Sequence, residues 1–247
     1  MRKKADPGRI SAIEFRREGL IILQTLKNRW RGWQLRKRGI RRELRIDTWA
    51  AGDRSGVWVV DPTLLTRNSV VYSFGVGDNL AWELAMIERF GLTVHAFDPT
   101  PASMAWVERQ SLPPTLMFHP SGLAAHDGNM GFAPRRPGSR INFRPIAETG
   151  VAVIECPVAR LSTFMRELGH EYIDVLKMDI EGGEYTVLDD LLATRASVKQ
   201  LLVEFHHHFP DVGIKATQRA VRGLEDAGFR IFHISERALE FSFRHGD

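Results

Sequence analysis

Short apolar runs alternate with helical stretches over most of this chain, and this alternation constrains the fold more than any other feature. β-rich runs occupy residues 70–74, 93–97, 116–119, 172–178 and 198–205, and helical patterns occupy 81–90, 101–110, 184–192 and 217–227. Two more β-rich runs, 229–234 and 239–243, follow with no helix between them. The pattern predicts an α/β fold with a mostly parallel seven-stranded sheet, helices on both faces and a C-terminal antiparallel hairpin.

Charge divides the chain into two parts. Residues 1–46 hold 15 Lys/Arg and 4 Asp/Glu, a net charge of +11, whereas residues 47–247 hold 19 Lys/Arg and 26 Asp/Glu, a net charge of −7. We therefore expect a basic helical leader over 1–46 and one domain over 47–247. An acidic domain argues against a protein that binds nucleic acid over its whole surface, so no nucleic-acid partner is expected.

The leader has the spacing of an amphipathic helix over residues 10–42, which contain no proline. Leu23, Leu26, Trp30 and Trp33 recur on one face, and basic residues lie elsewhere around the helix. Three roles fit this pattern. The apolar stripe could pack on the domain, the helix could lie on an anionic membrane surface, or it could dock a nucleic acid or an acidic partner.

Other features bear on the compartment. No apolar run approaches the ~20 residues that span a bilayer, and the early run 20–23 is shorter than a signal-peptide core. Cys156 is the single cysteine, which excludes an intramolecular disulfide. These features predict a cytoplasmic protein, with the inner face of a membrane as an alternative site through residues 10–42.

A cofactor-binding pattern follows the first two strands of the alternating region. Gly75 and Gly77 come directly after residues 70–74 and would let a ligand approach the backbone closely. Asp98 ends the second strand 23 residues after Gly75, near the spacing of an acid that holds a ribose. The pair fits NAD or S-adenosylmethionine. Leu80 replaces the third glycine of a dinucleotide fingerprint, which favours S-adenosylmethionine.

Three carboxylates follow the strand at 172–178. Asp179, Glu181 and Glu184 surround Gly182 and Gly183, which permit a tight turn. Clustered carboxylates repel one another unless they meet cations, donors or a ligand. A helix start would explain Glu181 and Glu184 but explains Asp179 less well. The cluster therefore predicts a functional site.

The segment Lys-Met-Asp-Ile-Glu-Gly-Gly-Glu at 177–184 resembles the K-x-D-x-E-G-x-E signature of FkbM-type S-adenosylmethionine-dependent methyltransferases. Residues 71–79, 96–99 and 202–206 are similar to other ordered motifs of that family, and the resemblance covers about residues 57–245. Many members have Glu where this chain has Asp98, and the leader lies outside the resemblance.

The resemblance implies a Rossmann-like class I methyltransferase fold with S-adenosylmethionine as cofactor. Gly75, Gly77 and Asp78 would lie at its amino-acid end, Asp98 would hold the ribose, and Gly122 and Leu123 would flank the adenine. Asp127 is a weaker candidate for the adenine amino group, and Asp179 would lie beside the methionine moiety or the methyl acceptor.

The family usually methylates oxygen atoms on sugars or natural products, so the expected acceptor is a hydroxyl of a saccharide, a lipid-linked glycan or a small natural product. A nucleic-acid or protein methyltransferase docked by the leader is an alternative. It is weakened because the chain has no Asn-Pro-Pro-Tyr-type tetrapeptide. A non-catalytic cofactor-binding protein is the other alternative.

Methyl transfer to a hydroxyl needs alignment and a group that takes the proton. His206 is the first candidate for the base, and Glu204 should point to the same side of the strand. Asp179, Glu181, Glu184 and His206 would also suit a divalent metal, but no short ligand motif demands one and none is expected. Residues 128–150 predict a surface loop or small hairpin, whose Arg135, Arg136, Arg140 and Arg144 could instead face an anionic acceptor.

Overall fold

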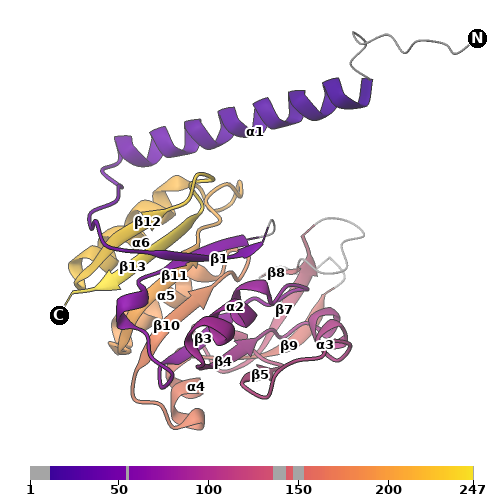
Figure 1. Cartoon of the computed structure of the whole chain (residues 1–247), viewed down its shortest axis with the longest axis vertical. Helices are drawn as coiled ribbons and strands as arrows, with labels where there is room; N and C mark the ends of the chain where they lie inside the picture. The colour runs from indigo at the N-terminus through magenta and orange to yellow at the C-terminus, as the bar shows by residue number, and fades with distance from the viewer. Residues whose placement is uncertain (1–11, 54–55, 136–142, 147–152, 247) are drawn as a thin grey trace, which may run out of the picture.

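A computed structural model describes residues 12–53, 56–135, 143–146 and 153–246, with side chains from residue 22 onward. Figure 1 shows an α/β body with a long helix, α1, running above it. The elements before the carboxylate cluster are α1 (Ala12–Lys37), β1 (Trp49–Asp53), β2 (Gly56–Val60), the 3-10 helix η1 (Pro62–Leu64), β3 (Val70–Phe74), α2 (Ala81–Phe90), β4 (Thr93–Phe97), α3 (Pro101–Val107), β5 (Leu116–His119), β6 (Gly122–Leu123), β7 (Gly128–Pro134), β8 (Phe143–Pro145), β9 (Ile154–Ala159), α4 (Leu161–Leu168) and β10 (Ile173–Met178). Those after it are α5 (Glu184–Thr194), β11 (Val198–Glu204), α6 (Ile214–Asp226), β12 (Phe229–Ile234) and β13 (Glu240–His245).

The main sheet runs in the order β12-β13-β11-β10-β3-β4-β5. Neighbours from β11 to β5 pair in parallel, and β13 pairs antiparallel with both β11 and β12. The chain moves outward from β3 to β4 and β5, and later from β10 to β11 on the other side. The direction of winding therefore reverses between β3 and β10. Ligands of such sheets bind at this reversal, beyond the carboxyl ends of the strands.

Neighbouring strand residues bury against opposite faces of the sheet, as the period of two requires. Val71 packs in a cluster with Trp82 and Met86 of α2 and with Trp58 of the β1–β2 hairpin. Tyr72 packs in the cluster on the other face, which includes residues of α4, α5 and α6. The predicted α/β class is confirmed. The β1–β2 hairpin and α4 were not predicted.

Residues 128–159 contribute to a second sheet of order β6-β9-β7-β8. β7 and β8 pair antiparallel. Of the two predictions for residues 128–150, a surface loop or a small hairpin, the structure supports the hairpin. β9 pairs with β7, and Ile154, Cys156 and Val158 alternate into an apolar cluster with Phe132. Arg136 and Arg140 lie outside the described residues.

The helix α1 is shorter than the predicted 10–42. It ends at Lys37 because Gly39 adopts a φ of 82° and the Ile40 amide turns back to the Leu35 carbonyl at 3.1 Å. Leu35 and Ile40 are buried, but Leu23, Leu26, Trp30 and Trp33 are 46–59% exposed, so the stripe does not pack on the domain. No helix in the described part of the chain is long and apolar enough to cross a membrane.

A histidine cluster lies on the α4 side of the sheet and should make stability depend on pH. His95 Nδ1 is 3.0 Å from His119 Nε2, and the Tyr72 hydroxyl is 2.7 Å from His170 Nδ1. Burial, aided by charge on His119 and His170, lowers the pKa of His95 to about 4. The unfolded chain takes up this proton near pH ~6.5. Neutral His95 therefore contributes fully to the free energy of unfolding above pH ~6.5. This contribution is lost as the pH falls toward about 4.

We expect the free energy of unfolding to fall by about 1–2 kcal/mol through His95 between neutral pH and pH ~4.5, allowing for partial solvent screening. Urea unfolding of the parent and of His95→Gln at both pH values would measure this. The variant should show a smaller pH dependence. An unchanged pH dependence would contradict the assignment.

Candidate active site

A pocket of about 830 Å³ opens where the main sheet reverses direction. Its wall contains nearly every residue that the sequence singles out: Gly75, Gly77, Asp78, Asp98, Gly122, Leu123, Asp179, Glu204 and His206. These residues come from β6, from the ends of β3, β4, β10 and β11, and from the loops that follow those ends. The volume is in the range of small-molecule and cofactor sites.

Asp127 is the exception among the predicted cofactor residues. Its carboxylate accepts hydrogen bonds from the Arg160 amide at 2.9 Å and the Thr163 hydroxyl at 3.1 Å, at the start of α4. It is not among the described residues that line the pocket. The structure therefore gives Asp127 a capping role at a helix that the sequence analysis missed, and it does not bring Asp127 together with the other predicted cofactor residues.

Gly75 allows two loops of the site to meet. Its φ is 87°, and a Cβ atom there would lie 1.8 Å from the carbonyl oxygen of Asp179. The loop after β3 thus contacts the loop after β10 backbone to backbone, which only glycine permits.

Asp98 anchors the loop that follows β3. Oδ2 accepts from the Gly77 amide at 2.8 Å, and Oδ1 accepts from the Thr100 amide at 2.9 Å and the Thr100 hydroxyl at 2.6 Å. Burial raises the pKa of Asp98, and these hydrogen bonds oppose the rise. A carboxylate offers about four acceptor positions. Oδ2 therefore retains one for a ligand in the pocket.

The turn after β10 is organised by the side chain of Glu184. Its carboxylate accepts from the Ile180 amide at 3.0 Å and the Gly182 amide at 3.1 Å. Glu181, a residue with a Cβ, takes a φ of 51° in this turn, and Gly182 takes 104°. Left-handed backbone at a non-glycine residue is uncommon and is concentrated at functional sites.

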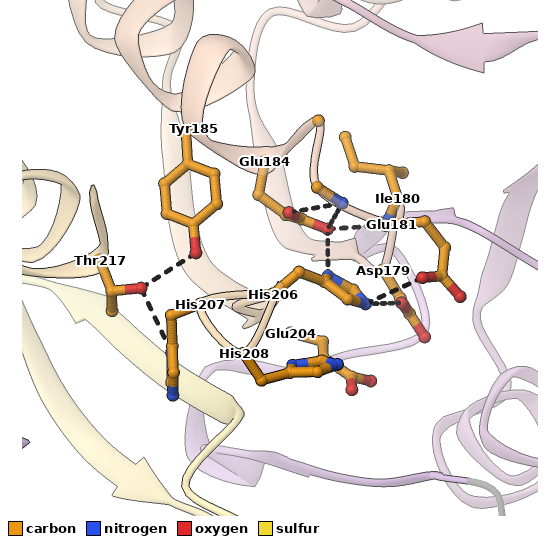
Figure 2. A network of polar contacts seen from close by, with 12 residues as sticks. Asp179, Ile180, Glu181, Glu184, Tyr185, Glu204, His206, His207, His208 and Thr217 are labelled. Atoms are coloured by element: carbon orange, nitrogen blue, oxygen red, sulfur yellow. Dashed lines mark hydrogen bonds and ion pairs between the residues drawn. The ribbon is translucent and has the colours of Figure 1, made fainter. Parts of the chain in front are cut away.

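Figure 2 shows His206 held between carboxylates of this turn. Its Nδ1 lies 2.9 Å from Glu184 Oε1, and its Nε2 lies 3.3 Å from Glu181 Oε2 and 3.8 Å from Asp179 Oδ1. Burial opposes a charge on the ring, but the carboxylates of Glu184, Asp179 and Glu204 outweigh it and raise the pKa of His206 to about 10. A protonated imidazole has no lone pair for another proton. The geometry therefore favours His206 as a counter-charge rather than as the base.

The same residues were considered as metal ligands. Ligand atoms of Asp179, Glu184 and His206 lie within 4.8 Å of one another. However, the Glu184 oxygens already accept hydrogen bonds from two backbone amides and from His206 Nδ1. A metal at Glu184 would therefore share a carboxylate that already has three hydrogen-bond partners.

The other histidines of the triplet differ from His206. Burial is the main cause that lowers the pKa values of His207 and His208 to about 4. His207 Nδ1 lies 3.3 Å from the Thr217 hydroxyl, and His208 Nε2 accepts from Arg135 at 3.1 Å. Both rings are therefore neutral and lie in structural contacts.

Two further ion pairs line the pocket. Glu204 is buried and accepts from Arg237 at 2.9 Å. Burial raises the pKa of Glu204 to about 8, with Asp179 and Glu240 adding to the rise and Arg237 opposing it. On the α2 side, buried Lys177 lies 3.2 Å from Glu83 and donates to the Ser73 hydroxyl at 3.1 Å.

Several wall residues were not predicted from the sequence. Trp58 belongs to β2, and with Trp82 it flanks Lys177 Nζ at 5.1 and 5.8 Å from the ring centroids. The short β-rich apolar run at residues 56–60 was the missed signal for Trp58. Arg237 follows β12 in a loop, and no motif marks it.

One arginine beside β7 reaches the site from the second sheet. Arg135 lines the pocket and lies 3.3 Å from Glu181. Arg144 pairs with Asp211, and the guanidinium groups of both arginines lie about 5 Å from the Phe209 ring centre. The expectation of a solvated loop therefore does not hold for Arg135, whereas Arg144 is not among the described residues that line the pocket.

Comparison with known proteins agrees with the site. The family model described as "Methyltransferase FkbM domain" matches residues 70–231. The chain belongs to the FkbM methyltransferase family, whose usual cofactor is S-adenosylmethionine.

Two curated proteins are similar to this chain, and both are named "Probable methyltransferase-like protein 24". The human protein is 30% identical over 174 residues, covering 66% of this chain and 42% of its own length. The protein of Rattus norvegicus is 29% identical over 179 residues, covering 68% and 43%. The chain thus spans little more than two fifths of the length of these relatives.

Among solved structures, the crystal structure of methyltransferase FkbM from Methylobacillus flagellatus KT aligns with a TM-score of 0.45 and 12% identity. The alignment covers 73% of this chain and 44% of that one.

Proposed function

We propose that this protein transfers a methyl group from S-adenosylmethionine to a hydroxyl oxygen of a saccharide, a lipid-linked glycan or a small natural product. The observation that carries the proposal is the pocket at the sheet reversal, in which Gly75, Gly77, Asp98 and Asp179 share one wall. Membership of a methyltransferase family supports the reaction type.

The cofactor assignment rests on the two loops beyond β3 and β4. The open acceptor position of Asp98 Oδ2 suits a ribose hydroxyl, and Gly75 and Gly77 line the adjoining wall. Leu80 is only 2% exposed and packs in an apolar cluster before α2. Its side chain occupies the position where a dinucleotide fingerprint has a glycine for close packing, which favours S-adenosylmethionine over NAD.

In the proposed reaction the acceptor oxygen attacks the methyl carbon, the carbon–sulfur bond breaks, and S-adenosylhomocysteine and a methyl ether form. The hydroxyl proton passes to a carboxylate. We assign that role to Asp179, because its side chain is 32% exposed and lines the pocket. The His206 cation, 3.8 Å from Asp179 Oδ1, would hold this carboxylate in place, and Glu204 would complete the polar wall.

Titration calorimetry with S-adenosylmethionine and, separately, with NAD tests the cofactor assignment. We expect micromolar-range binding of S-adenosylmethionine and much weaker binding of NAD. If S-adenosylmethionine does not bind, the proposal fails. If S-adenosylmethionine does bind, a screen of cell-envelope extracts with methyl-labelled cofactor would identify the acceptor class.

A further inference from the structure

A stripe of large apolar side chains runs along the outside of α1. Ile22, Leu23, Leu26, Trp30 and Trp33, the α1 stripe, are 60, 56, 55, 59 and 46% exposed. At about 100° per residue, all five fall within an arc of about 100° on the helix surface. Contiguous exposed apolar residues of this size mark an interaction surface in soluble domains.

The opposite side of α1 holds the helix to the body. Leu35 is 1% exposed in the core, and it lies about 170° around the helix from the centre of the stripe. Arg31 donates to the Arg237 carbonyl at 3.3 Å, and the Gln218 amide donates to the Arg38 carbonyl at 3.4 Å. The stripe therefore points away from the α/β body, above which α1 runs in Figure 1.

Positive charge flanks the stripe. Residues 19–42 contain eight Lys/Arg and no Asp/Glu. Lys27, Arg29, Arg36 and Lys37 are exposed, and Lys37 Nζ lies 4.3 Å from the Trp33 ring centre. On the helix surface Arg29 and Arg36 border one edge of the stripe and Lys27 borders the other. Apolar aromatic residues bordered by Lys and Arg suit the interface of an anionic lipid surface.

The charge argues against a second copy of α1 as the occupant. Two stripes packed face to face would bring the basic borders of both helices together, and like charges at close range repel. An anionic bilayer instead attracts these side chains and accepts the apolar stripe.

We propose that α1 lies in the plane of an anionic phospholipid surface, with the α1 stripe buried among the lipids and the basic border at the headgroups. Because Arg31 bonds to the backbone of Arg237, whose side chain lines the pocket, this docking would place the wall of the pocket beside the membrane. The docking itself does not depend on the proposed methyl transfer.

Vesicle co-sedimentation of the full chain tests the proposal. The probes are vesicles of phosphatidylcholine alone and of phosphatidylcholine mixed with phosphatidylglycerol. We expect binding to the anionic vesicles, a decrease with added salt, and little binding to the neutral ones. Leu26→Ser/Trp30→Ser/Trp33→Ser should weaken binding at least roughly tenfold. Lys27→Gln/Arg29→Gln/Arg36→Gln should weaken it mainly at low salt.

Matched controls keep the test specific. Leu84→Ser/Met117→Ser changes two exposed apolar residues of the body, and Arg67→Gln/Arg109→Gln/Lys215→Gln removes three exposed charges there. Both should bind vesicles like the parent. The affinity of the stripe variant for S-adenosylmethionine, measured by calorimetry, should match that of the parent and so show that the body is folded. If the parent itself does not bind S-adenosylmethionine, that result counts against the proposed function and not against the docking.

Three outcomes would overturn the docking proposal. These are no binding of the parent to anionic vesicles, undiminished binding of the stripe variant, or equal losses in the controls. A dimer in sedimentation velocity without vesicles that the stripe variant converts to a monomer would assign the stripe to a second copy instead.

Discussion

Asp98→Ala is expected to weaken S-adenosylmethionine binding by roughly 10²- to 10⁴-fold. The substitution removes the acceptor proposed for the ribose and also releases the Gly77 amide, so the cofactor loop loses its anchor. Hydrogen bonds to a charged group contribute about 1.5–3 kcal/mol each, and loss of about two of them gives this range. Titration calorimetry would measure the change.

Asp127→Ala is the matched control for Asp98→Ala. Asp127 is also a carboxylate that holds a backbone amide and a hydroxyl, but it lies outside the described pocket lining. Its loss should lower the stability slightly, as the loss of a helix cap does, and leave cofactor affinity unchanged. Asp98→Asn keeps one acceptor oxygen, so its affinity for S-adenosylmethionine should lie between those of the parent and Asp98→Ala. Parent-like affinity of Asp98→Ala would refute the assignment.

Glu184→Ala should lower the free energy of unfolding by about 3–5 kcal/mol, the loss expected when one partner of a buried ion pair is removed. Glu184 is 0% exposed and His206 is 1% exposed, so neither water nor another described group replaces the lost carboxylate easily. The amides of Ile180 and Gly182 would also lose their acceptor. Urea unfolding monitored by circular dichroism would measure this change in the free energy of unfolding.

Asp179→Asn supplies the comparison within the same turn. Because the Asp179 side chain is 32% exposed, its replacement should change the free energy of unfolding by less than about 1 kcal/mol. Glu184→Gln keeps oxygen for the amides and loses only the charge, so its cost should be intermediate. Equal stability losses for Glu184→Ala and Asp179→Asn would show that the turn is not organised around Glu184.

The sequence was most informative where local chemistry and position agree. Strands such as 70–74 and 93–97 are short, apolar and followed by Gly75 and Asp98, so their boundaries and their approach to one pocket could be predicted. Asp98 and Asp179 could be placed at the site because the carboxyl ends of parallel strands meet at one edge.

Other features depend on contacts between distant parts of the chain. Asp127 has the residue type of an adenine ligand, but its role was decided by α4, whose amide at Arg160 lies 33 residues away. His206 looks like a base in isolation. The carboxylates of Glu184, Asp179 and Glu204 reverse that expectation, because their combined charge outweighs the cost of burying a cation. Arg135 and Arg237 reach the pocket from loops that no periodicity marks.

At Gly75 the loop after β3 touches the backbone of Asp179 in the loop after β10. With 1.8 Å between a virtual Cβ and the Asp179 carbonyl, no side chain cushions the two loops. Any residue other than glycine at position 75 would force the two loops apart, so one missing Cβ atom sets how closely the loops after β3 and β10 can approach each other.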